Sequence, residues 1–296
     1  MTRSSSIQLL RGPLGLQRAL RCLTFLLIIP SVMTTAMAQG STLREVGKDV
    51  QSCNRTDHSS PDLRIRSCSA IINSAAAAPR AVVIAYTNRG NAYGAKGQYD
   101  RAIEDYNQSI DGNPNYAKAF NNRGAAYQKL GQHQRAIEDF DRSIILDPVS
   151  APVFINRAAN FEKLGEYSRA LMDYNEAIRL QPNLASAWNG RCWVRAIIGE
   201  LGPALADCNE SIRLKPSVAV ALDSRALTYL KLGQWDTAIA DYNSALQLSP
   251  DLASSLYGRG LSKRRKGDRA TSETDIAAAI AISPSIANEF TRYGVH

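Results

Sequence analysis

Residues 114–148 have the sequence PNYAKAFNNRGAAYQKLGQHQRAIEDFDRSIILDP, and this stretch decides the fold. Apolar residues recur in it at helical spacing in two runs, which a glycine-containing turn divides. Phe120 and Tyr127 mark one face of the first run, and Phe140 marks one face of the second. Pro148 then ends the second helix, because proline lacks a backbone N–H and clashes with the preceding helical turn. The stretch predicts two short antiparallel helices.

The same pattern recurs every 34 residues without an insertion or a deletion. Three series of residues have this period. The first is Pro114, Pro148, Pro182, Pro216, Pro250 and Pro284. The second series is Arg89, Arg123, Arg157, Arg191, Arg225 and Arg259. The third is Asp105, Asp139, Asp173, Asp207, Asp241 and Asp275. Because two short helices cannot bury an apolar face alone, the pairs must stack and share a continuous core. The sequence therefore predicts an all-α solenoid of six helix-turn-helix repeats over 81–284.

These residues resemble the tetratricopeptide repeat (TPR) family. Its pattern is a large apolar residue, a small residue, a tyrosine, an alanine, an aromatic residue and a proline. The second copy has Phe120, Gly124, Tyr127, Ala136, Phe140 and Pro148, and the fifth has Leu222, Ala226, Tyr229, Ala238, Tyr242 and Pro250. Arg195, Lys263 and Ser272 depart from the pattern. The resemblance implies a right-handed superhelix whose first helices line a concave groove.

The two ends of the chain do not form full repeats. Residues 39–80 contain one segment whose residue pattern resembles the second helix of a repeat. We expect a partly helical N-terminal cap there. Residues 285–296 resemble the start of a seventh first helix, with Phe290 in the large apolar position. We expect this C-terminal helix stub to cap the open end of the core, as terminal repeats must.

The first 38 residues have the three parts of a secretory signal peptide. Four arginines and no acid are followed by a short apolar run at 23–29 and by Ala36-Met37-Ala38. The run is too short for a permanent membrane span, although a retained anchoring helix is the alternative. Cleavage after Ala38 would leave 35 − 4 = 31 basic residues against 27 acidic ones, a net charge of +4. That value does not favour nucleic acid as a partner. We expect a secreted protein, in the bacterial periplasm, with no transmembrane segment after cleavage.

Four cysteines remain after cleavage, an even number that favours disulfides in an exported chain. In the fourth repeat, the TPR resemblance places Cys192 at the small-residue position of the first helix. It places Cys208 at the aromatic position of the second helix of the same repeat. In the family these positions pack against each other, which implies a Cys192–Cys208 disulfide. With that pair assigned, Cys53 and Cys68 remain and would tie down the N-terminal cap.

The sequence contains no recognisable active site. The three histidines, His58, His133 and His296, have no metal-ligand spacing and no regularly placed nucleophile beside them. No phosphate-binding loop or dinucleotide fingerprint is present. We therefore expect no enzymatic activity, no cofactor and no metal.

The repeated arginines and aspartates lie sixteen residues apart, on the two helices of each pair. We interpret them as structural ion pairs, with a ligand-binding row as the alternative. A ligand-reading groove would vary between repeats, and these residues do not.

The candidate partner-binding residues lie on the first helices. Asn88, Asn122 and Asn156 occupy one position in the first three repeats, with Asn91 and Asn121 nearby. Amides both donate and accept, so such a row can pair with the backbone of an extended peptide. The position becomes Gly190, Ser224 and Gly258 in the last three repeats.

The second half of the groove offers a more apolar wall that includes Trp193, Leu227, Leu230, Tyr257 and Leu261. An exposed apolar stripe of this kind would be a partner site.

The sequence thus predicts a periplasmic scaffold that binds an extended peptide or a helix of a partner protein. The alternative is a structural subunit of an envelope assembly, such as secretion, polysaccharide export or division machinery. A polar, solvent-filled groove would favour transient peptide binding. A groove filled by residues 285–296, or an apolar convex face, would favour permanent assembly.

Overall fold

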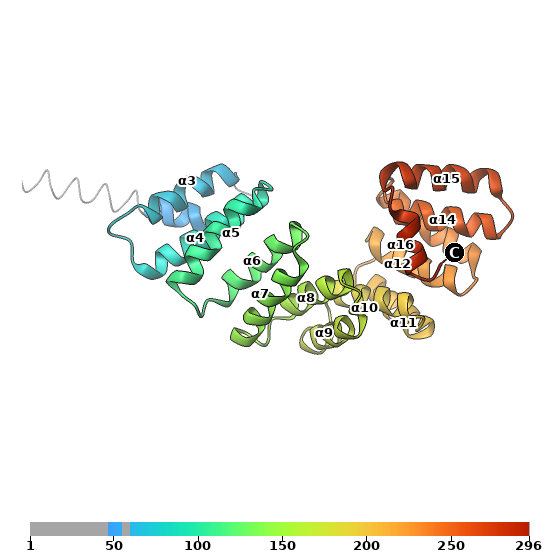
Figure 1. The fold of residues 1–296 in the computed structure, drawn as a ribbon, viewed down its shortest axis with the longest axis horizontal. Coiled ribbons are helices and arrows are strands. Elements are labelled where there is room, and N and C mark those ends of the chain that lie inside the picture. The colour runs from blue at the N-terminus through green and yellow to red at the C-terminus, as the bar shows by residue number, and fades with distance from the viewer. Residues whose placement is uncertain (1–46, 55–59, 296) are drawn as a thin grey trace, which may run out of the picture. The chain divides into compact units, whose positions relative to one another are not determined.

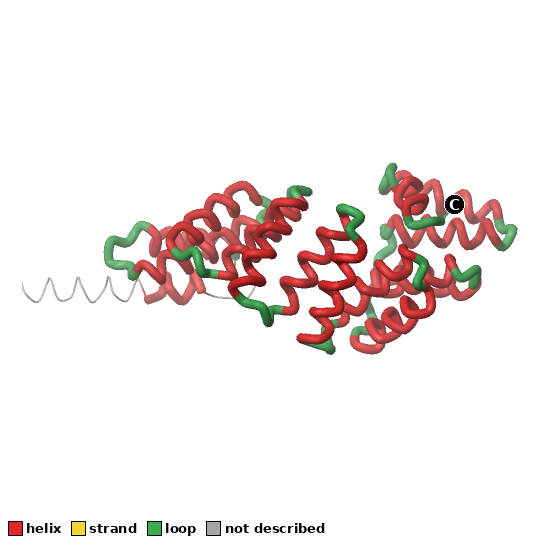
Figure 2. The backbone as a smooth tube through the Cα atoms, turned by 60° about the horizontal axis from the view of Figure 1, so that its bottom comes forward, coloured by secondary structure: helices red, strands yellow, loops and turns green. Residues whose placement is uncertain are grey.

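The computed structural model describes residues 47–54 and 60–295, and these contain helices and loops but no strand (Figure 2). The chain divides into two compact units, 1–77 and 78–296. The predicted signal peptide, residues 1–38, lies outside the described residues, as does His58. No helix of the described ranges is long and apolar enough to cross a membrane.

The first unit contains a helix at 47–54 and α3 (Pro61–Ile72). Pro61 begins α3, where its missing N–H costs no helical hydrogen bond. A disulfide between Cys53 and Cys68 joins the two helices, with a Cα–Cα distance of 4.9 Å.

The second unit contains six helix pairs, drawn from cyan to red in Figure 1. The pairs are α4 (Pro79–Ala95) with α5 (Tyr99–Gly112), α6 (Ala117–Lys129) with α7 (His133–Leu146), α8 (Ala151–Lys163) with α9 (Tyr167–Leu180), α10 (Ala185–Ile198) with α11 (Leu201–Leu214), α12 (Ala219–Lys231) with α13 (Trp235–Leu248), and α14 (Ala253–Arg265) with α15 (Arg269–Ile282). A short helix, α16 (Ile286–Arg292), follows. The prediction of an all-α stack of helix pairs is confirmed.

The turn inside each pair depends on a glycine. Gly131, for example, has φ +71°, a left-handed conformation that costs glycine little and strains other residues. The next residue, Gln132, donates its N–H to the carbonyl of Tyr127 and so closes the end of α6. A positive-φ glycine recurs at this position in all six pairs.

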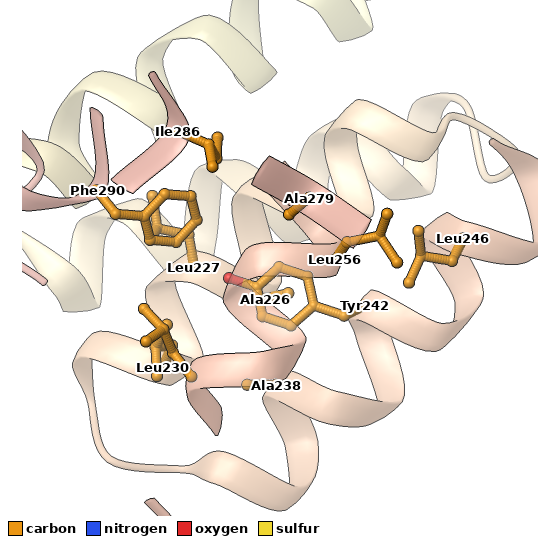
Figure 3. Close-up of a cluster of buried hydrophobic side chains, with 11 residues drawn as sticks. Ala226, Leu227, Leu230, Ala238, Tyr242, Leu246, Leu256, Ala279, Ile286 and Phe290 are labelled. Atoms are coloured by element: carbon orange, nitrogen blue, oxygen red, sulfur yellow. The ribbon is translucent and has the colours of Figure 1, made fainter. Parts of the chain in front are cut away.

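The two helices of a pair approach closely because small residues face aromatic ones. A Cβ added to Gly124 would lie 2.9 Å from the ring of Phe140, which is fully buried. Successive pairs then stack, because each second helix packs on the first helix of the next pair and neighbouring first helices also touch. The result is a continuous core, one cluster of which is shown in Figure 3.

Candidate partner-binding groove

The repeated arginines and aspartates join the two helices of every pair. Arg123 Nε and Nη2 donate to the two carboxylate oxygens of Asp139 at 2.8 and 2.7 Å. The same two-bond fork is present in all six pairs. A planar guanidinium matches a carboxylate in this way, and a lysine cannot.

Five of these arginines also reach the preceding repeat. Arg123 Nη1 donates to Asn107 Oδ1 at 2.6 Å, and so one side chain connects α6 to both α7 and α5. The acceptors in the five repeats are Asn107, Asp141, Asn175, Asn209 and Asn243. Sequence analysis missed this series, although it has the same period of 34. The guanidiniums are thus engaged by the protein's own helices, and we do not include them in the partner-binding site.

Four of the five predicted asparagines form one hydrogen-bonded chain across the first three repeats. Asn156 donates to Asn121 at 3.3 Å, Asn121 donates to Asn122 at 3.0 Å, and Asn122 donates to Asn91 at 2.7 Å. The Tyr106 hydroxyl also donates to Asn91 Oδ1, at 2.8 Å. The fifth, Asn88, lies half-buried on α4. The amides are therefore held in fixed orientations by one another.

A tyrosine from the preceding repeat fills the space of a side chain at this position in the fourth and sixth repeats. A Cβ added to Gly190 would lie 2.2 Å from the Tyr174 ring, and one added to Gly258 would lie 2.2 Å from the Tyr242 hydroxyl. At these two positions only glycine leaves room for the ring as it lies here. Tyr174 instead extends across Gly190, and its hydroxyl hydrogen-bonds to Glu162.

A pocket of about 410 Å³ lies beside Tyr174 and is lined by residues of the third to fifth repeats. We call it the central pocket. It is lined by Glu162, Tyr174, Ala185, Ser186, Asn189, Gly190, Trp193, Ser211, Lys215, Val218, Val220, Asp223 and Ser224.

Two carboxyl groups of the central pocket titrate far from their usual range. Burial raises the pKa of Glu162 to about 7, against the opposing effect of the Tyr174 hydrogen bond. Burial likewise raises the pKa of Asp223 to about 6, although the hydroxyls of Ser254 and Ser255 donate to it at 2.9 and 2.6 Å. No ion pair to either acid is found among the described residues.

Sequence analysis overlooked both acids. Asp223 lies one period after Asn189 and three periods after Asn121, so these residues share one position of the first helices. A charged residue in such a row is the signal that could have identified it.

The apolar half of the groove is covered by the protein's own C-terminal helix, which corrects the prediction of an exposed stripe. Leu227 is only 1% exposed and Phe290 of α16 packs against it (Figure 3). The Tyr257 and Phe290 ring centroids are 4.9 Å apart, and those of Trp193 and Tyr293 are 5.1 Å apart. The physical reason is the apolar area that Phe290 and its neighbours remove from water.

A lysine fixes the end of this C-terminal segment. Lys231 Nζ donates to the carbonyls of Ala196, Ile197 and Tyr293 at 2.6, 2.9 and 2.7 Å. The first two are carbonyls near the end of α10, where helices favour a cation. Lys231 therefore ties the C-terminal segment to two helices of the groove wall.

A second pocket, of about 370 Å³, lies between α8 and the C-terminal segment; we call it the C-terminal pocket. Its lining includes Glu162, Tyr167, Trp193, Glu289, Arg292 and Tyr293. Glu162 and Trp193 line both pockets, so the two cavities adjoin.

A disulfide links Cys192 of α10 to Cys208 of α11, with a Cα–Cα distance of 5.3 Å. Both residues are fully buried in a small cluster with Ala196 and Ala204. The bond occupies the place that a glycine and an aromatic ring fill in the second repeat. In the described ranges, no group of three or more histidines, cysteines or acids could hold a metal ion.

Comparison with known families identifies the repeats. The TPR repeat model matches residues 90–131 and 226–267, and two tetratricopeptide repeat models match residues 117–148 and 151–184. No curated protein matches the chain at a significant level.

Several solved structures have a similar fold. A tetratricopeptide repeat protein from Parabacteroides merdae is 18% identical with a TM-score of 0.66, and the match covers 85% of this chain and 99% of that one. PilW, a type IV pilus biogenesis factor, is 19% identical with a TM-score of 0.62, over 71% and 98% of the two chains. Pseudomonas aeruginosa pilF is 19% identical with a TM-score of 0.60, over 72% and 98%. At these identities the likeness concerns the fold.

Proposed function

Because the chain is a tetratricopeptide repeat protein, a non-catalytic scaffold, we propose that it binds an extended peptide or a helix of a partner protein in its groove, in the bacterial periplasm. The central pocket carries this proposal. It combines a volume of about 410 Å³ with an aromatic wall and buried polar groups, which is the composition of a recognition site.

The asparagine chain supports the same function. It lies on the first helices of the first three repeats, and the central pocket begins at Glu162, on the first helix of the third. An extended peptide along these helices would meet fixed amides first and the pocket next. Amides supply backbone recognition, and a pocket supplies side-chain specificity.

The periplasmic location rests on the cysteines and on the N-terminal segment. Disulfides persist in oxidising compartments and are rare in the reducing cytosol. Two are present, and each closes a loop of fifteen or sixteen residues. An N-terminal segment with the parts of a signal peptide would deliver the chain to such a compartment.

A permanent subunit of an envelope assembly is the second candidate, and the position of α16 favours it. A groove whose last repeats are filled by the chain itself has less room for a transient ligand. Ile145 and Met172, both 70% exposed on second helices, would then contribute to permanent contacts. One of the similar structures is a pilus biogenesis factor.

Site-specific photo-crosslinking in cells distinguishes the two candidates. A crosslinking amino acid at Ser186, which is exposed and lines the central pocket, should capture a partner. The same amino acid at Met172, on a second helix and outside both pockets, is the matched control. Capture at Ser186 alone supports peptide binding. Capture at Met172 alone supports permanent assembly and contradicts the groove function.

A further inference from the structure

The walls of the central pocket are of two kinds. Trp193, Val218 and Val220 provide apolar surface. The acceptors among the lining groups are the carboxylates of Glu162 and Asp223 and the amide oxygen of Asn189. The hydroxyls of Tyr174, Ser211 and Ser224 already donate within the protein, to Glu162 and to the carbonyls of Ala185 and Val220.

Asp223 differs from every other buried aspartate in the described structure. The six others belong to the repeated series, and each is held by the fork of an arginine. Asp223, 6% exposed, is held by two serine hydroxyls and by no cation. A buried carboxylate without a cation costs free energy that a bound cation would recover.

Asn189 provides an independent observation. Its Oδ1 is buried and has no hydrogen-bond partner in the described structure. Buried acceptors are nearly always satisfied, so an orphaned one in a pocket wall indicates a missing donor. The one basic residue of the lining, Lys215, is exposed. Within the described residues, the pocket thus holds a buried carboxylate that no cation contacts and a buried amide oxygen that no donor reaches.

We propose that the central pocket binds the arginine side chain of a partner peptide, an inference that rests on the proposed function. A guanidinium carries one positive charge and five N–H donors, which matches two carboxylates and an amide oxygen. Its flat face also stacks on an indole, and Trp193 supplies that ring. The peptide backbone would continue along the first helices toward the asparagine chain.

The ionisation of the pocket agrees with a cationic ligand. Burial raises the pKa of Glu162 to about 7 and that of Asp223 to about 6, so both carboxyls are partly protonated near neutrality. A bound guanidinium would lower both pKa values and release protons. The other charged or titratable groups near these two carboxyls are Lys163, Tyr167, Tyr174, Lys215, Asp241, Tyr242, Glu289, Arg292 and Tyr293.

Calorimetry with a defined peptide tests the proposal. The probe is acetyl-Ala-Ala-Arg-Ala-Ala-amide, and its control carries citrulline, which is neutral and nearly the same shape as arginine. The arginine peptide should bind at least about tenfold more tightly, the scale of a charge-assisted hydrogen bond. Titration at about pH 6.5 in two buffers of different ionisation enthalpy should show proton release for arginine and none for citrulline.

Variants assign the effect to the pocket. Glu162→Gln and Asp223→Asn should each weaken arginine-peptide binding by about tenfold or more. Glu138→Gln removes an exposed acid of α7 that lies outside the pocket, and should leave binding unchanged. Ser186→Arg disturbs no buried contact and places a fixed cation at the exposed edge of the pocket. It should weaken binding even if the two acid variants fold poorly.

Equal affinity for arginine and citrulline peptides overturns the proposal, as does binding that survives Ser186→Arg and both acid variants. A dimer in light scattering with no peptide binding would mean that a second copy fills the pocket, and also overturns it. The proposed function fails separately, because a partner crosslinked at Ser186 would uphold groove binding even where citrulline binds equally well.

Discussion

Five of the six arginines of the repeated series each connect three helices through one side chain. Arg123 donates hydrogen bonds to both carboxylate oxygens of Asp139 in its own repeat and to Asn107 Oδ1 in the preceding repeat. Both acceptors come from second helices, so the guanidinium fastens a repeat internally and to its neighbour. Residues that do this cannot vary between repeats, which accounts for their perfect period.

The Arg123→Ala variant should lower the unfolding free energy by about 2–4 kcal/mol, because it leaves Asp139 buried without its cation. Chemical denaturation measures this loss. Arg213→Ala is the control, since this side chain is 67% exposed beside Glu210. An exposed pair of that kind is screened by water and contributes little to stability. Equal losses for both variants would mean that the fork is no more than a surface contact.

The Glu162 carboxyl makes stability depend on pH in an unusual direction. Its folded pKa of about 7 lies above the ordinary value of 4.5, so the folded state holds the proton more tightly than the unfolded state does. This contribution is fully present below about pH 4.5 and is lost as pH rises through about 7. Over that window it amounts to about 3 kcal/mol at 1.4 kcal/mol per pKa unit.

Glu162→Gln should therefore reduce the difference in unfolding free energy between pH 5 and pH 8, as measured by urea titration at each pH. Glutamine can still accept the Tyr174 hydrogen bond, so packing is conserved. The control Glu138→Gln should retain the wild-type pH dependence. If Glu162→Gln retains it too, the carboxyl is not buried as the structure places it.

At the scale of the element, the fourth pair differs from the others in its internal contact. The second pair packs Phe140 against Gly124, whereas the fourth joins Cys192 to Cys208. The disulfide compensates for a missing ring by restricting the unfolded chain rather than by burying aromatic surface.

Replacing both Cys192 and Cys208 by alanine should lower the unfolding free energy by about 3 kcal/mol, the value for a loop of this length. The combination Cys192→Gly with Cys208→Phe restores the contact of the second pair and should recover part of the loss. Thermal denaturation of both variants, under non-reducing conditions, measures it. Identical melting temperatures for the two variants would show that the aromatic contact does not substitute for the bond.

The helix pairs could be predicted because their evidence is local and repeated. Apolar spacing, a turn glycine and a terminal proline recur in every copy, so each copy supports the others. The Arg123–Asn107 contact also has this period, but the acceptor series is harder to recognise because one of its five members, Asp141, is an aspartate. The central pocket could not be predicted in the same way. The pocket depends on the orientation of the Tyr174 side chain and on the burial of Asp223. Both are determined by packing between repeats.

At the scale of the second unit, the position of α16 depends on contacts between distant parts of the chain. Tyr293 meets Trp193, and its carbonyl accepts from Lys231. These partners lie on α10 and α12, and α16 also packs on α14 and α15. In a repeat protein, a helix that follows the last repeat would be expected to contact only that repeat. The C-terminal segment instead bridges the last three repeats across the groove.

Phe290→Ala should therefore loosen more of the chain than the last repeat. Phe290 is 1% exposed, and truncating a buried phenylalanine costs about 3–5 kcal/mol. Hydrogen exchange with mass spectrometry should show faster exchange in α14 and α16 and also at the end of α10, where Tyr293 and Lys231 make their contacts. Helices α4 to α7 should keep their protection, because they have no contact with this segment.

Arg292→Ala, at an exposed position of the same helix, is the control and should change little. Faster exchange confined to α14 to α16 would contradict the bridge, since it would mean that the unit unfolds from its end one repeat at a time. If hydrogen exchange in the Phe290→Ala variant is also faster at α10, the packing of α16 must stabilise α10. In that case a ligand that displaces α16 would loosen the same helix that lines the central pocket, and binding at the two places would be coupled.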